Sequence, residues 1–153
     1  MIDATVAENI AFGLQGDEID LAAVKRAAEM AKISGFINDS LPDKYDTVIG
    51  DRGIRLSGGE RQRLGIARAL YTDPNVLVFD EATSALDNLT EKAIIEEIHS
   101  LSKKKTIIMI AHRLSTVKKC DAIIVLNNGR IEATGTYSEL LVKTNSFANM
   151  ADV

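Results

Sequence analysis

The chain has 153 residues, 46% of them hydrophobic, which gives it the size and apolar content of one packed domain. Its formal net charge of −4 weighs against a nucleic-acid partner, because such partners usually require a basic surface. The single cysteine, Cys120, excludes an internal disulfide. No apolar run approaches the roughly 20 residues of a membrane-spanning helix. We therefore expect a soluble, intracellular chain.

The first third of the chain predicts helices joined by turns. Helical spacing of apolar residues is found over 3–12, 20–33, a short stretch around 36–37, and 58–70. The expected N-caps of the three longer helices are Asp3, Asp20 and Ser57. Residues 41–56 carry mostly turn signals.

The second half alternates strands with helices. Strand-type runs span 75–81 and 106–112, and residues 122–135 predict a hairpin around Asn128-Gly129. Helices are expected at 90–101 and 136–143, capped by Thr90 and Thr136. Continuous apolar strands that alternate with helices indicate an α/β fold whose parallel sheet is covered on both faces.

Polar residues stand where the two apolar strands end. Asp80 and Glu81 follow one strand, and His112 follows the other. Ligands of open α/β sheets bind beyond the carboxyl ends of the strands, so these residues are candidates for a site. The two acids can hold Mg²⁺ and polarise a water, or they can cap the next helix. His112 can contact a phosphate or relay a proton, or it can be an ordinary polar residue.

A second candidate site precedes the helix at 58–70. Ser57 is a good N-cap, and Gly58 and Gly59 allow unusual dihedrals and a close approach to a ligand. Unpaired amides and the helix dipole favour an anion at such an end. The alternative is a glycine-rich turn before a capped helix. The run 103–105 of lysines is either a basic patch or the solvated end of the preceding helix.

The order of three motifs resembles the nucleotide-binding domain of ATP-binding cassette (ABC) transporters. "LSGGE" (56–60) is similar to the ABC signature motif and "VLVFDE" (76–81) to Walker B with its catalytic glutamate. "SALD" (84–87) looks like the D-loop, and His112 matches the switch histidine. "DATVAENIAFG" (3–13) and "TVIGDRG" (47–53) resemble segments of exporter-type cassettes.

The resemblance implies a partial P-loop NTPase-like fold. Residues 1–72 would form the ABC helical subdomain and residues 73–153 the C-terminal part of the RecA-like core. The P-loop pattern G-x-x-x-x-G-K-[ST] is absent, since none of the ten glycines precedes a lysine. We therefore expect the C-terminal portion of a cassette without the P-loop strand. Part of its apolar core would be exposed, and the chain alone would not hydrolyse ATP.

The resemblance also implies roles for named residues. Ser57, Gly58, Gly59 and Glu60 would bind the ATP of a second nucleotide-binding domain in a head-to-tail dimer. Glu81 would be the general base, His112 would steady the γ-phosphate, Asp80 would hold Mg²⁺ and Asp87 would communicate across the dimer. Glu60 stands where the family most often has Gln, and its charge would weaken anion binding unless Arg61 or Arg63 offsets it.

The function implied is that of the ATP-hydrolysing motor of an ABC exporter. Its partners would be a second such domain and the transmembrane domain of the transporter, at the cytoplasmic face of the plasma (inner) membrane. Two alternatives are a non-catalytic interaction fragment and part of a soluble ABC ATPase. No residue indicates the transported substrate.

Overall fold

The computed structural model describes residues 1–51, 54–102, 104–111 and 113–151. Contacts divide the chain into two compact units, residues 1–108 and 109–153. The expected subdomains, residues 1–72 and 73–153, remain a prediction. A division into compact units does not show to which subdomain a residue belongs.

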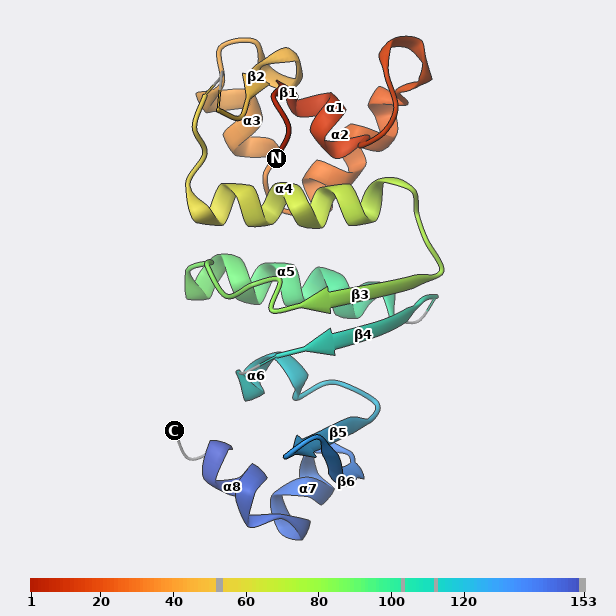
Figure 1. Ribbon diagram of the computed structural model, residues 1–153, viewed down its shortest axis with the longest axis vertical. Helices are drawn as coiled ribbons and strands as arrows, with labels where there is room; N and C mark the ends of the chain where they lie inside the picture. Colours follow the sequence, from red (N-terminus) through yellow and green to blue (C-terminus); the bar gives the residue numbers. More distant parts are fainter. Residues whose placement is uncertain (52–53, 103, 112, 152–153) are drawn as a thin grey trace. The chain divides into compact units, whose positions relative to one another are not determined.

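The elements follow the predicted order closely (Figure 1). Up to residue 71 they are β1 (Ala4–Thr5), α1 (Val6–Ile10), the 3-10 helix η1 (Gly16–Glu18), α2 (Leu21–Met30), α3 (Ser34–Ser40), the 3-10 helix η2 (Lys44–Asp46), β2 (Val48–Ile49) and α4 (Gly58–Tyr71). The rest are β3 (Val76–Asp80), α5 (Asn88–Leu101), β4 (Thr106–Ile110), α6 (Leu114–Val117), β5 (Ile123–Asn127), β6 (Arg130–Gly135), α7 (Tyr137–Lys143) and α8 (Asn145–Ala151). The short strands β1 and β2, the 3-10 helices η1 and η2, and the helices α6 and α8 were not expected.

Two N-terminal helices begin at capping residues. Asp20 caps α2 as predicted, since its carboxylate accepts the backbone amides of Ala22 and Ala23. The cap of α1 is Thr5 rather than Asp3, because Thr5 and Glu8 form a reciprocal capping box. Strand β1 occupies Ala4 and Thr5, so the helix begins only at Val6.

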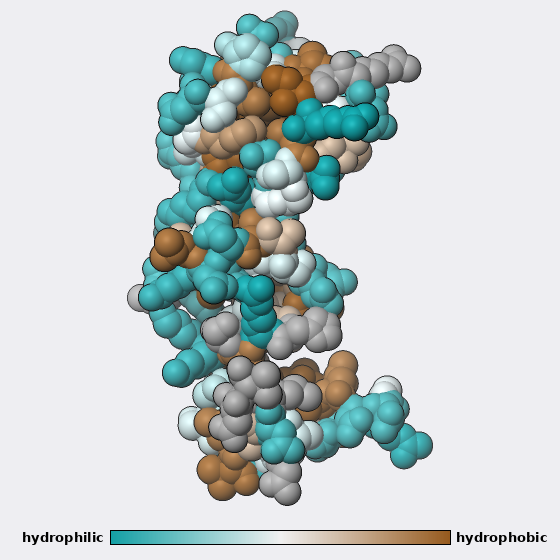
Figure 2. Space-filling view, turned by 90° about the vertical axis from the view of Figure 1, so that its left-hand side faces the viewer, coloured by the Kyte–Doolittle hydropathy of each residue, from teal (hydrophilic) through white to brown (hydrophobic). Residues whose placement is uncertain are grey.

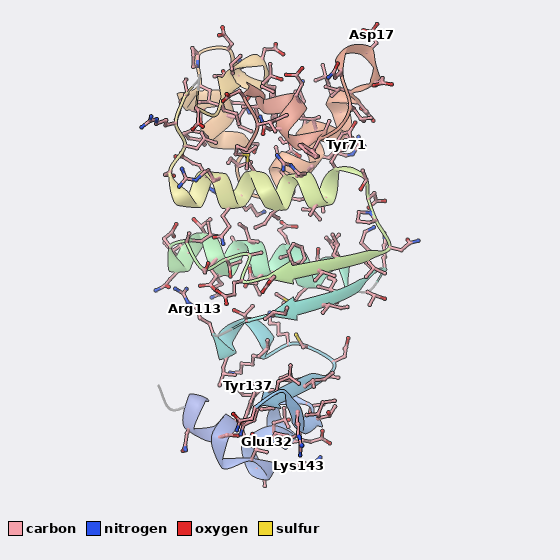
Figure 3. All side chains as sticks on the ribbon, in the orientation of Figure 1. Asp17, Tyr71, Arg113, Glu132, Tyr137 and Lys143 are labelled. Carbon is pink, nitrogen blue, oxygen red and sulfur yellow. The ribbon has the colours of Figure 1, made fainter. Side chains whose placement is uncertain are left out.

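Helices α1, α2 and α4 pack together in the first unit. Their apolar faces bury small and branched side chains, among them Val6, Ile10, Val24, Ala28, Leu64 and Ala67. Alanines on α2 allow the helices to approach closely. At the far end of α4 the hydroxyl of Tyr71 accepts the amide of Asp20 at 3.1 Å, which ties α4 to the start of α2 (Figure 3).

Strands β3 and β4 are hydrogen-bonded neighbours that run in the same direction in Figure 1, separated in sequence by α5. The side chains alternate along β3: Leu77 and Phe79 are buried, whereas Val76 and Val78 are 53% and 60% exposed. Ile108 on β4 is 50% exposed. The pair is therefore covered on one face only, so the expectation of two covered faces is wrong here. A uniformly apolar run does not reveal which neighbours are present to cover it.

The expected exposure of apolar core is confirmed for these described strand residues. Figure 2 shows hydrophobic side chains reaching the surface among hydrophilic ones. Exposed apolar surface of this kind favours association.

A mostly buried lysine side chain contacts the loop before β3. The ammonium of Lys105 donates to the carbonyl of Pro74 and pairs with the carboxylate of Asp73, both at 2.7 Å, and only 9% of its side chain is exposed. This contact lowers the pKa of the Asp73 carboxyl. Lys105 therefore belongs neither to a basic patch nor to a solvated helix end. Lys103 lies outside the described residues.

The second unit contains the predicted hairpin. Asn128 and Gly129 both have positive φ, 51° and 73°, as a tight two-residue turn requires. Strands β5 and β6 are antiparallel. The core of the unit consists of Val125, Leu140 and Phe147. Thr136 caps α7 as predicted. Within the described parts of the chain, no helix is long and apolar enough to span a membrane.

Candidate functional site

Ser57 starts α4 as the sequence predicts. Its hydroxyl accepts the amide of Glu60 at 3.3 Å, and the Glu60 carboxylate accepts the amide of Ser57 at 2.7 Å. These two bonds form a capping box, which fixes the backbone of the first turn. The Glu60 carboxylate is thus engaged in the cap, and the guanidinium groups of Arg61 and Arg63 donate to the carbonyls of Leu56 and Lys32.

Gly58 and Gly59 form the first turn of α4 with helical dihedrals. The prediction that they adopt unusual dihedrals is wrong. Among the described residues, the glycines with positive φ are Gly13, Gly16, Gly50 and Gly129. A side chain at either position would make only ordinary van der Waals contacts with Ala85. A Cβ on Gly59 would lie 3.4 Å from the carbonyl oxygen of Ala85, and one on Gly58 would lie 3.7 Å from the Ala85 side chain.

The amides of Gly58 and Gly59 are suited to an anion. Among the described residues no hydrogen bond to either amide is found, in contrast to the amides of Ser57 and Glu60. The first turn of a helix leaves such donors unpaired, and the helix dipole adds partial positive charge there. The start of α4 is therefore chemically able to bind a phosphate.

Substituting Ser57 with alanine should lower the free energy of unfolding of the chain by about 1 kcal/mol, because the cap to Glu60 is lost. Urea unfolding of the purified chain measures this. Ser40→Ala, which changes an exposed serine at the end of α3, is the matched control and should leave the midpoint unchanged. An equal effect of both variants would contradict the capping role.

Asp80 and Glu81 lie at the carboxyl end of β3, and both are exposed. Glu81 adopts φ of 47°, a left-handed conformation that is uncommon for a residue with a side chain. The alternative that this pair caps the next helix is wrong. Helix α5 begins only at Asn88, with Asp87 as its cap.

Asp87 is the N-cap that the sequence had assigned to Thr90. Its carboxylate accepts the amides of Leu89 and Thr90 at 3.1 and 3.0 Å. The bond from the Thr90 amide is the main reason why the pKa of the Asp87 carboxyl is lowered. The helix starts two residues earlier than expected because Asp87 supplies a cap before Thr90 is reached.

Gln62 is the residue that sequence reasoning missed. Its side-chain amide donates to the carbonyl of Glu81 at 2.9 Å and to the hydroxyl of Ser84 at 3.3 Å. Its side-chain oxygen accepts the amide of Ala85 at 2.9 Å. The sequence offers one signal: Gln62 lies four residues after Gly58, and therefore on the same face of α4. Through these bonds α4 contacts the segment that follows β3.

The switch-histidine candidate, His112, lies outside the described residues. Its neighbour Arg113 stands at the N-cap of α6 (Figure 3). No group of three or more His, Cys, Asp or Glu side chains suited to a metal occurs in the described parts of the chain. Mg²⁺ bound together with phosphate needs only one or two carboxylates, so Asp80 remains compatible with such an ion.

Comparison with known proteins assigns the family. Residues 2–84 match the family model described as ABC transporter. The chain is 46% identical over 98% of its length to an ATP-dependent lipid A-core flippase of Ralstonia nicotianae, and 47% identical over 92% of its length to the ATP-binding cassette sub-family B member 5 of Mus musculus. It covers 25% and 11% of these two proteins.

A solved structure shares the fold. A bacterial Atm1-family ABC exporter with ATP bound superposes with a TM-score of 0.90 and 43% sequence identity. The match covers 99% of this chain and 26% of that chain. The fold is therefore that of the ABC ATPase domain, and the chain belongs to the ABC transporter family.

Proposed function

We propose that the chain is part of the ATP-hydrolysing motor of an ABC exporter, which couples ATP hydrolysis to transport across a membrane. The observation that carries the proposal is the similarity along nearly the whole chain to an ABC exporter with ATP bound. The chain spans about a quarter of the length of the flippase it matches. The activity of the whole protein is therefore a proposal, and its cargo is not assigned.

In this proposal the start of α4 acts on ATP held by a second nucleotide-binding domain. The hydroxyl of Ser57 and the amides of Gly58 and Gly59 donate to the γ-phosphate. The capping box with Glu60 supports this, because it preorganises the turn before ATP arrives. Closure of the two domains over ATP would complete the site.

The carboxyl end of β3 acts on the ATP of its own domain. Glu81 is the general base that polarises the attacking water. Asp80 would hold Mg²⁺, which would neutralise phosphate charge when bound. His112 steadies the γ-phosphate, and Asp87 communicates across the dimer. The exposure of both acids at the strand end supports these roles, since ATP and water must reach them.

The proposed partners are a second nucleotide-binding domain, arranged head to tail, and the transmembrane domain of the same transporter. The motor would then work at the cytoplasmic face of the membrane. Residues 1–72 are assigned to the helical subdomain and residues 73–153 to the RecA-like core.

The 153-residue chain by itself should not hydrolyse ATP. In P-loop ATPases the loop backbone and its lysine cradle the β- and γ-phosphates, and the matching pattern is absent from this sequence. Each charge-assisted hydrogen bond contributes roughly 1.5–3 kcal/mol, so losing several should weaken ATP binding by at least about 100-fold.

Calorimetry with ATP and Mg²⁺ tests this proposal. It compares the 153-residue chain with a form of the protein extended upstream until it includes a P-loop, and ATP turnover is measured on both. We expect binding and turnover only in the longer form, and their loss when the P-loop lysine of that form is replaced by alanine. Tight binding by the short chain would instead indicate a nucleotide-binding module with a different site. Absence of turnover in the longer form would favour the non-catalytic alternative.

A further inference from the structure

Gln62 joins two parts of the chain that the proposed function uses separately. It belongs to α4, the helix that begins at Ser57, and its side chain bonds to the segment between β3 and α5. All of these residues lie in the same compact unit. The side-chain amide of Gln62 uses both its donor and its acceptor in these contacts.

Gln62 bonds to the backbone of Glu81, which has an uncommon conformation. Glu81 has φ of 47°, which a residue with a side chain adopts only when its surroundings hold it there. The Glu81 carbonyl accepts two hydrogen bonds, from the Gln62 side chain at 2.9 Å and from the Ser84 amide at 3.1 Å. The second bond is local to the turn, whereas the first anchors the turn to α4.

The hydrogen bonds of Gln62 lie at the surface, beside the first turn of α4. Gly58, Gly59 and Gln62 face the same segment, since Ala85 lies against both glycines and donates its amide to Gln62. The same segment is also held by the buried bond from the Thr83 hydroxyl to the Glu91 carboxylate, at 3.0 Å.

We infer that Gln62 is a positioning residue for ATP hydrolysis. From its place on α4 it holds the Glu81 backbone in the left-handed conformation, and this orients the Glu81 carboxylate. This inference rests on the proposed function, in which Glu81 is the general base. Gln62 touches neither ATP nor the attacking water in this role. Its substitution should reduce the rate of the chemical step and leave ATP binding in place.

The test uses the full-length protein and the variant Gln62→Met, which keeps the length of the side chain and removes its hydrogen bonds. We expect kcat for ATP hydrolysis to fall at least 10-fold while KM for ATP changes less than twofold. Ser84→Ala, which leaves the bond to the Glu81 carbonyl intact, should have a smaller effect. Gln15→Met, at an exposed glutamine, is the matched control and should change neither constant.

Hydrogen exchange on the same proteins provides a readout that does not require ATPase activity. Exchange of the Ala85 amide should be about 3- to 10-fold faster in Gln62→Met, because the bond to the Gln62 oxygen is lost. An unchanged kcat in an active protein would overturn the inference alone, and so would a parallel loss of kcat, ATP affinity and stability. A wild-type protein without ATP turnover would overturn the proposed function, while Ala85 exchange would still report whether Gln62 holds the segment.

Discussion

Glu81→Gln in the full-length protein is expected to lower the rate of ATP hydrolysis by at least about 100-fold, the usual contribution of a general base. ATP binding should persist, because glutamine has the same shape and removes only the carboxylate that accepts the proton. Glu81 lies exposed directly after β3, where its side chain is accessible to a water and a phosphate. Phosphate release and ATP binding, measured on the same preparation, check both halves of this prediction.

The matched control for this variant is Glu96→Gln, at an exposed glutamate on α5. It makes the same chemical change far from the carboxyl end of β3 in sequence, so turnover should stay at the wild-type level. Full activity of Glu81→Gln would remove Glu81 from the mechanism, and with it the role inferred for Gln62. Equal losses in both variants would show that the assay responds to charge in general.

Leu64→Ala should lower the free energy of unfolding of the chain by about 2–5 kcal/mol, the cost of truncating a fully buried leucine. Leu64 is 1% exposed on α4, which packs against α2. Because total stabilities of domains are about 5–15 kcal/mol, this is a large share. The midpoint of urea unfolding, measured on the purified chain, gives the change.

Leu89→Ala provides the comparison for Leu64→Ala. Leu89 is 82% exposed at the start of α5, so the same truncation should change stability by less than about 0.5 kcal/mol. Similar midpoints for the two variants would mean that α4 does not pack in solution as it does in the structure. The first turn of α4, which carries Ser57 and Gly58, would then not be held by the packing of this helix.

Local signals in the sequence determined much of the fold. Asp20, Ser57 and Thr136 cap helices as predicted, because each supplies a side-chain oxygen to amides within three residues. The Asn128-Gly129 hairpin is also confirmed. Its turn is a local signal too, because both residues tolerate positive φ. The caps at Asp3 and Thr90 were wrong, because a second suitable oxygen, on Thr5 or Asp87, took the position.

The motifs "LSGGE" and "VLVFDE" identified the family from sequence, and the match of residues 2–84 to its model confirms it. The roles of Ser57, Glu81 and Asp87 remain predictions, because a role depends on a substrate and a partner.

Only the tertiary structure decided which residues hold the two motifs together. Gln62 contacts residues 19 and 22 positions away, and the contact of Lys105 with the loop at Asp73 and Pro74 spans more than 30 positions. No local pattern specifies such pairs, since they depend on how helices and strands pack. The one-sided covering of β3 has the same origin: hydropathy records that Val76 and Val78 are apolar, whereas their exposure depends on which elements lie against them.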